Sequence, residues 1–391
     1  MVRISDILRR GRGEEEESEK KSEEAAKLRK EKLFAKAPKK GDEKKVSFKA
    51  AQEEAKKEAP PELITKKAKE EKPAPSQVEI ARVMMEKTKA GRPKAKELYQ
   101  ELITLMKDIL AKGERYEPIE GKEIVVKIDR MIDQMAMAGD ELLDLTNNFT
   151  PNNYLIGHLV NVCLISIKVG LGLGYNKSKL NELAISGFLY DIGMIKVMDI
   201  VQQPRKLTVE EYSKIKQHPI YGEEILKKVK DLTKVAIYVS REQHERMNGA
   251  GYPKGLKNDE ISEYARIVGL IDVYEAMTHP RPHRKRFSPY EAMKEILKAK
   301  NQFDPRFLKV LISEISIYPV GSWVELSTHE IGKVIRINRD LPLRPTVNVI
   351  FGPDGRKLDE VKSIDLTRHP TLYIKKPLGD SELKTKLTAN K

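Results

Sequence analysis

The sequence contains a single cysteine, Cys163, and has no long apolar run. One thiol cannot form a disulfide within the chain, which is typical of proteins in a reducing compartment. It also excludes a zinc or iron–sulfur site built from several cysteines of one chain. The nearest candidate for a membrane span, residues 159–175, is interrupted by Asn161 and Lys168, and the N-terminus lacks the apolar core of a secretory signal. We therefore expect a cytoplasmic protein with no transmembrane span.

Aromatic residues are scarce at the start of the chain, where charge is dense. Residues 1–75 hold 22 Lys and Arg and 17 Asp and Glu, so they bury too little apolar surface to offset the entropy lost on ordering. They contribute 22 − 17 = +5 to the whole-chain charge of 73 − 59 = +14. We predict a disordered, charged tail. Because the two signs are interspersed, a solvated tail is favoured, and nucleic-acid binding through the tail is a second alternative.

The rest of the chain predicts helices followed by strands. From residue 76 onward apolar residues recur at helical spacing, which indicates a helical lead-in over 76–149 and a helical domain over 150–317. The apolar period then changes to two, which predicts a small β-barrel or sheet module over 318–378, with a tail over 379–391. The expected fold class is mostly α, a helical bundle with a small C-terminal β module.

Local signals mark several helix starts. Thr208 with Glu211, and Ser288 with Glu291, have the spacing of capping boxes, in which each side chain bonds the backbone N–H at the other end of the motif. Asp304 precedes a proline, a combination of N-cap and first helical residue. These signals predict helices that begin just after each cap.

Histidine is also scarce, with seven residues in the chain. Three of those in the helical region, His158, His218 and His244, have informative neighbours. In the same region Asp191 and Asp272 are acids within apolar stretches. A buried carboxylate needs a partner, and histidines and carboxylates jointly hold divalent metals. Two such metals can activate water and clamp a phosphoryl oxygen. From periodicity alone, polar core residues satisfied by hydrogen bonds are the favoured alternative.

The most specific motif is His-Glu-Arg at 244–246, followed by Asn-Gly-Ala-Gly-Tyr-Pro-Lys-Gly-Leu at 248–256. With Arg-Pro-His-Arg-Lys at 281–285 and Phe-Asp-Pro at 303–305, it resembles the HD-GYP family, a branch of the HD metal-dependent phosphohydrolases. The resemblance covers residues 154–307 and implies a helical HD domain. The best-known activity of that family is hydrolysis of cyclic di-GMP, a bacterial second messenger.

The resemblance implies a two-metal site. The positions that match metal ligands are His158, Asp191, His218, His244 and Asp272, with the first of the two aspartates as the carboxylate that bridges both metals. It also implies substrate contacts by a rigid turn and by two arginines suited to phosphate, namely Gly251, Tyr252, Pro253, Arg281 and Arg284. A purely structural turn and a solvated basic loop are the alternatives. The remaining histidines, His279 among them, match no ligand position and are expected on the surface.

Several positions depart from the family pattern. Tyr190 and Gln243 stand where the family has histidine ligands, and Met194 stands where it usually has a lysine, although Lys196 is nearby. Tyr154 replaces an acid that supports a third metal in some members, so a third metal is not expected. Each remaining metal position has three protein ligands, and metal affinity should fall accordingly.

The sequence therefore predicts a bacterial-type signalling protein with a degenerate site that acts by binding cyclic di-GMP or a partner protein. The alternative is an active phosphodiesterase that hydrolyses cyclic di-GMP through metal-bound water. Asp191 with His218 and His244 has the two-histidine, one-carboxylate composition that holds iron(II). One or two divalent metals, iron or manganese, or no metal are left open, as are enzyme activity and a homodimer.

Overall fold

The structure is a computed structural model, and it describes most of the chain from residue 77 onward. Side chains are described from Ala95. The described residues are 77–138, 145–146, 154–201, 203, 205, 207–279, 286–379, 382–383 and 385. The charged tail predicted for 1–75, both Arg281 and Arg284, and most of the tail predicted for 379–391 lie outside them.

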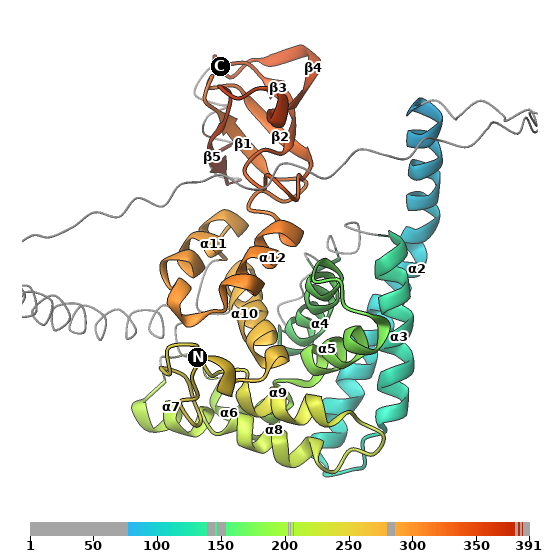
Figure 1. Cartoon of the computed structure of the whole chain (residues 1–391), viewed down its shortest axis with the longest axis vertical. Helices are drawn as coiled ribbons and strands as arrows, with labels where there is room; N and C mark the ends of the chain where they lie inside the picture. Colours follow the sequence, from blue (N-terminus) through green and yellow to red (C-terminus); the bar gives the residue numbers. More distant parts are fainter. Residues whose placement is uncertain are drawn as a thin grey trace, which may run out of the picture. The chain divides into compact units, whose positions relative to one another are not determined.

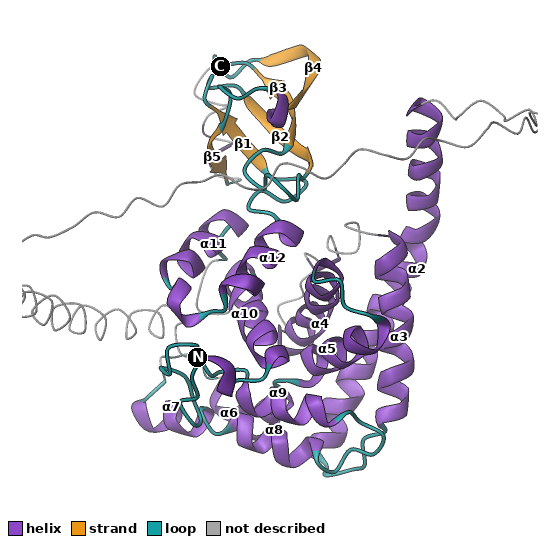
Figure 2. Ribbon diagram, viewed as in Figure 1, coloured by secondary structure: helices purple, strands orange, loops and turns teal. Residues whose placement is uncertain are grey.

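The regular elements of the described residues up to Ile315 are helices, joined by turns and loops (Figures 1 and 2). The longer helices are α2 (Gln77–Glu114), α3 (Gly121–Ala138), α4 (Tyr154–Gly172), α5 (Lys177–Leu189), α8 (His218–Leu226), α9 (Lys234–Glu242), α10 (Glu263–Thr278), α11 (Pro289–Lys298) and α12 (Pro305–Ile315). The short ones are η3 (Ile192–Val197), α6 (Met198–Val201), α7 (Val209–Ile215), η4 (Asn258–Glu260) and η5 (Lys300–Gln302). The predicted mostly helical fold class is confirmed.

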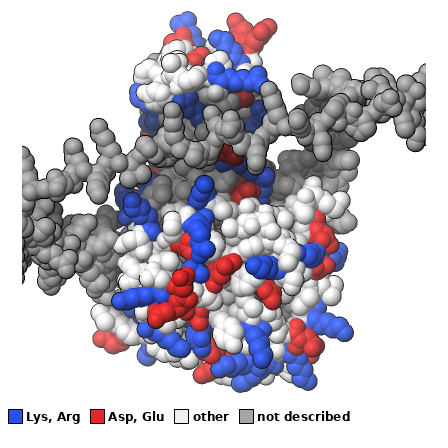
Figure 3. Space-filling view, in the orientation of Figure 1, with Lys and Arg blue, Asp and Glu red and all other residues white. Residues whose placement is uncertain are grey.

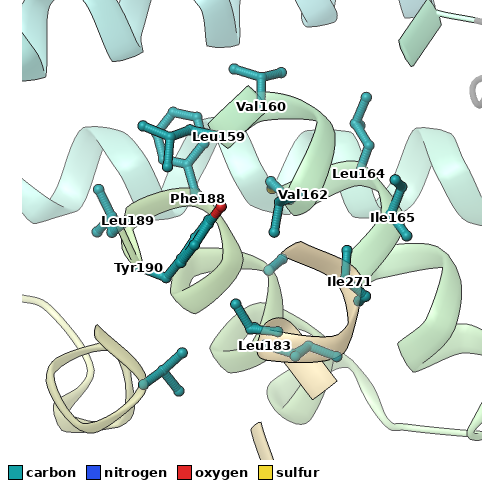
Figure 4. Close-up of a cluster of buried hydrophobic side chains, with 14 of the residues drawn as sticks. Leu159, Val160, Val162, Leu164, Ile165, Leu183, Phe188, Leu189, Tyr190 and Ile271 are labelled. Carbon is teal, nitrogen blue, oxygen red and sulfur yellow. The ribbon is translucent and has the colours of Figure 1, made fainter. Parts of the chain in front are cut away.

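Helix α4 is the core of this helical part. It packs against α3, α5, α10 and α12, and its apolar side chains join a cluster that includes Leu159, Phe188 and Ile271 (Figure 4). Among the described helices, α4 is the one long and apolar enough to cross a membrane, but 78% of its apolar window is buried inside the fold. The core helix of a globular protein has the same length and composition.

The predicted helix starts are confirmed by their hydrogen bonds. Thr208 and Glu211 form a capping box at α7, and Ser288 and Glu291 form another at α11. The Asp304 side chain accepts a hydrogen bond from the backbone N–H of Arg306 at the start of α12. Each cap satisfies a backbone N–H that has no partner within its helix.

The C-terminal module is a five-stranded antiparallel sheet. Its strands are β1 (Trp323–Leu326), β2 (Ile331–Arg336), β3 (Thr346–Phe351), β4 (Lys357–Asp365) and β5 (Ile374–Leu378), in the order β4-β3-β2-β1-β5, with η6 (Leu366–Arg368) after β4. β4 and β5 are the two edges and do not pair, so the sheet is open and a barrel in the strict sense is not formed. Its own small core includes Val324, Val334 and Val347.

Candidate metal centre

Helices and the turns next to them bring the five predicted ligands into the interior. His158 lies in α4, Asp191 between α5 and η3, His218 at the start of α8, His244 just after α9, and Asp272 in α10. His244 is partly buried and the other four side chains are buried. Hydrogen bonds divide the five into two groups, one around His218 and the other around His158.

The close approach of α8 to η3 brings His218 next to Asp191. Gly193 faces the first turns of α8, and a Cβ atom at this position would lie 2.5 Å from the backbone nitrogen of Gly222 and would overlap the carbonyl oxygen of His218. Only glycine allows two backbones to approach so closely. The glycine two residues after Asp191 therefore determines which residues surround that carboxylate.

The first group has the geometry of a cation site. The Nδ1–H of His218 donates to the carbonyl oxygen of Ile215 at 2.6 Å, because a carbonyl can only accept, so Nε2 is the ring atom that faces the group. This Nε2 lies 2.8 Å from Asp191 Oδ1 and 3.0 Å from His244 Nε2. One ligand atom from each of the three residues lies within 4.8 Å of the others.

Burial and charge set the protonation of this group in the absence of an ion. Burial, together with the positive charge of His218, lowers the pKa of His244 to about 3, so its imidazole is neutral. Burial acts to lower the pKa of His218, but the charge and hydrogen bond of Asp191 outweigh it and raise that pKa. Burial opposes ionisation of Asp191, yet His218 keeps the pKa of this carboxyl below its usual value. A carboxylate and a neutral imidazole are ready to bind a metal.

The second group is closed by hydrogen bonds. The Tyr190 hydroxyl lies 2.6 Å from Nε2 of His158 and donates to Asp272 Oδ1 at 2.9 Å. His158 Nε2 is itself 3.0 Å from Asp272 Oδ1, and its Nδ1 forms a hydrogen bond with the Glu275 carboxylate. The hydroxyl thus lies between His158 and Asp272, two of the side chains expected to bind metal.

The Tyr190 hydroxyl stays protonated where it lies. Its side chain is 0% exposed, within the apolar cluster of Figure 4, and burial together with the negative charge of Asp272 raises its pKa well above the usual value. Burial acts to lower the pKa of His158, but Glu275 and Asp272 raise it to about 9. A neutral phenol is a poor metal ligand, so this group does not fit a metal as the first group does.

Comparison with known proteins assigns the helical part. The family described as "HD domain" matches residues 147–307, and the family described as "KOW domain associated with HD domain" matches residues 323–386. Residues 147–307 are an HD domain. This match and the relatives described next confirm the predicted resemblance to the HD-GYP family of HD phosphohydrolases.

Curated relatives of this HD domain are phosphodiesterases of cyclic dinucleotides. A cyclic di-GMP phosphodiesterase of Pseudomonas aeruginosa is 32% identical over 228 residues, which are 58% of this chain and 55% of the relative. One of Borreliella burgdorferi is 31% identical over 235 residues, 59% of this chain and 62% of the relative. A 3'3'-cGAMP-specific phosphodiesterase of Vibrio cholerae is 26% identical over 189 residues, 47% of this chain and 36% of the relative. The chain thus spans a little over half the length of the first two relatives.

The loop formed by the motif at 248–256 is fixed to the segment that carries His244. The backbone N–H of Tyr252 donates to the carbonyl oxygen of His244 at 3.2 Å, and the two rings stack with centroids 4.7 Å apart. The Glu245 carboxylate accepts from the backbone N–H groups of Lys254 and Leu256 at 2.7 and 2.9 Å. The loop therefore has a structural role at the cation site, whatever else it contacts.

The neighbouring basic residue does not replace the missing lysine. Met194 is buried in η3, and the ammonium group of Lys196 lies over the ring of Tyr116, 3.6 Å from its centroid.

Figure 3 shows Lys and Arg interspersed with Asp and Glu across the visible helical face. No single basic patch covers that face.

Sequence reasoning missed a buried polar network behind His158. Glu275 bonds to His158 and accepts from the Asn161 amide at 2.9 Å. His279, expected on the surface, is instead buried and contacts the carbonyl oxygen of Thr146 at 2.7 Å. The signal for Glu275 was its spacing: three residues after Asp272, it lies on the same face of α10.

Proposed function

We propose that this chain is a receptor for cyclic di-GMP that holds one divalent metal and has little or no phosphodiesterase activity. The observation that supports the proposal is the position of the Tyr190 hydroxyl, which bonds both His158 and Asp272. A pair of metals about 3.5–4 Å apart is what clamps both oxygens of a phosphoryl displacement. If the Tyr190 hydroxyl takes up one of the two metal positions, the chain can still bind its ligand but loses the metal pair that catalysis needs. The single buried cysteine supports a cytoplasmic location.

The first group would hold the metal through Asp191, His218 and His244. A bound divalent metal supplies positive charge for a phosphate oxygen. The chain itself fixes the imidazole of His218 through Ile215 and that of His244 by stacking on Tyr252. Arg281 and Arg284 remain the proposed partners of the phosphate groups, and Gly251, Tyr252 and Pro253 the proposed rim of the ligand site.

The alternative is an active phosphodiesterase in which Asp191 bridges two metals. It is favoured by the names of the relatives, which are cyclic-dinucleotide phosphodiesterases. In that case Tyr190 must leave His158 and Asp272 when metal binds. The two proposals differ in metal stoichiometry and in turnover, so one set of measurements separates them.

The test starts from full-length protein purified without oxygen. We expect elemental analysis to give about one iron or manganese per chain, and calorimetry to detect cyclic di-GMP binding without its hydrolysis. Asp191→Ala should lose the metal. The triple variant Tyr190→His, Met194→Lys, Gln243→His should gain a second metal and measurable hydrolysis.

Wild-type turnover of cyclic di-GMP that Asp191→Ala abolishes would overturn the receptor proposal in favour of the enzyme. If circular dichroism shows that the protein is folded but it does not bind cyclic di-GMP, the receptor proposal is wrong and the bound partner would be a protein.

A further inference from the structure

Gln243 has a buried amide next to the cation site. It is the C-cap residue of α9 and is 0% exposed. Its Nε2 lies 3.3 Å from His218 Nε2 and 3.5 Å from Asp191 Oδ1. Its Oε1 is buried and has no hydrogen-bond partner among the described residues. An unpaired buried carbonyl is unfavourable, and such a group calls for an explanation.

A half-turn about χ3 of a glutamine side chain exchanges the positions of its amide oxygen, Oε1, and its amide nitrogen, Nε2. The ends have nearly the same shape, so packing alone does not fix which end faces the site. After that half-turn, Oε1 occupies the position of Nε2, about 3.3 to 3.5 Å from the ligand atoms of His218 and Asp191. Ligands bound at about 2.0–2.2 Å to one ion lie roughly 3.0–3.5 Å from each other. The position therefore suits a ligand of the same ion.

The backbone of Gln243 is held on several sides. Its N–H donates to the carbonyl oxygen of Val239 at 2.9 Å, and its carbonyl oxygen accepts from Arg246 at 3.0 Å. Gly269 of α10 packs against the same carbonyl, where any Cβ atom would overlap it. On this fixed backbone, the observed side chain brings the amide next to His218 and Asp191.

We propose that Gln243 is the fourth protein ligand of the metal, through its amide oxygen. The ligands are then two imidazole nitrogens, one carboxylate oxygen and one amide oxygen, so glutamine replaces a nitrogen ligand by an oxygen ligand. This proposal rests on the single-metal site of the proposed function. Carbonyl and carboxylate oxygens suit Mn²⁺ and Mg²⁺, whereas a further imidazole suits Zn²⁺ and Fe²⁺. The glutamine therefore shifts the preference of the site toward Mn²⁺.

The experiment titrates Mn²⁺ into metal-free, full-length protein and measures the dissociation constant by calorimetry, with electron paramagnetic resonance of the bound ion. Gln243→Met removes the oxygen at similar volume, and we expect affinity to fall about 100-fold, since even partners outside the ligand shell change it 10- to 100-fold. Gln243→Glu keeps an oxygen and adds charge, so it should bind at least as tightly as wild type. Gln243→His should raise the Zn²⁺ to Mn²⁺ affinity ratio about tenfold.

Gln302→Met is the matched control. Gln302 is also a buried glutamine whose Oε1 has no partner among the described residues, but it belongs to η5 and makes no recorded contact with the three ligands. We expect the Mn²⁺ affinity of Gln302→Met to stay within twofold of wild type. This control distinguishes the loss of a metal ligand from the general effect of losing a buried amide.

Unchanged Mn²⁺ affinity in folded Gln243→Met would overturn the ligand role and leave the single-metal site intact. If that variant does not fold, weaker Mn²⁺ binding by Gln243→Glu than by wild type would overturn it. Failure of wild type to bind Mn²⁺, Fe²⁺ or Mg²⁺ at all would overturn both this inference and the metal in the proposed function.

Discussion

At the scale of single residues, Gly251 shows how tightly the loop packs on the segment that carries His244. A Cβ atom there would lie 2.5 Å from the backbone nitrogen of Arg246 and 2.6 Å from the carbonyl oxygen of His244. Both neighbours are backbone atoms, which cannot rotate away as the end of a long side chain can. Any side chain at this position therefore moves His244 or the loop.

We predict that Gly251→Ala lowers the free energy of unfolding by about 1–3 kcal/mol, the usual range for overpacking, and weakens metal binding as His244 moves. Denaturant unfolding and Mn²⁺ titration measure the two effects. Gly379→Ala is the control, because a Cβ atom there meets nothing within 4 Å. Equal stability of the two variants would contradict the packing argument.

At the scale of elements, Asp304 joins α12 to α10. It caps α12, accepts from the Arg306 guanidinium at 2.8 and 3.1 Å, and accepts from Arg266 of the α10 helix at 3.1 Å. Burial acts to raise its pKa, but the hydrogen bonds and charge of Arg306, with Arg266, outweigh burial and lower it. One carboxylate thus fixes both the start of α12 and its position on α10.

We predict that Asp304→Asn lowers the free energy of unfolding by about 1 kcal/mol at pH 7. The amide oxygen of asparagine still caps the helix, and the exposed Arg306 guanidinium limits the ion-pair energy that is lost. The pKa of Asp304 is lowered by folding, so its stabilising effect is present above its unfolded pKa and is lost as pH falls through the folded value. Urea unfolding measures the difference in the free energy of unfolding between wild type and Asp304→Asn. We expect this difference to shrink as pH falls from 7 to 3. A difference that grew toward low pH would refute the assignment.

At the scale of the whole molecule, a metal at the first group ties α8 and the end of α9 to the loop after α5. Ligands from three separate segments are brought together only in the folded chain, so the metal binds the folded state and stabilises it. Binding energy is then added directly to the stability of the HD domain.

We predict that Mn²⁺ at about 100 times its dissociation constant stabilises the wild-type chain by about 2.7 kcal/mol and raises Tm by roughly 5–10 °C. EDTA should reverse the shift, and Asp191→Ala should not show it. Thermal unfolding followed by circular dichroism measures the effect. A Tm that responds equally to Mn²⁺ in wild type and Asp191→Ala would place the ion elsewhere.

The local features of this protein follow from short-range patterns in the sequence. Helix starts such as those at Thr208 and Ser288 depend on hydrogen bonds between residues three apart, and the apolar period distinguishes helices from strands. The motif at 244–256 indicated the HD domain through its resemblance to the HD-GYP family. Its hydrogen bonds also link residues close in the chain.

The grouping of the candidate ligands follows from the packing of distant helices. Tyr190 lies 32 residues from His158 and 82 from Asp272, yet its hydroxyl bonds both. The burial of Glu275 beside His158 likewise depends on the packing of α10 on α4. No local pattern encodes these distances, because they follow from how separate helices pack. The sequence named the residues, and their packing separated a candidate cation site at Asp191, His218 and His244 from a second group that contains the Tyr190 hydroxyl.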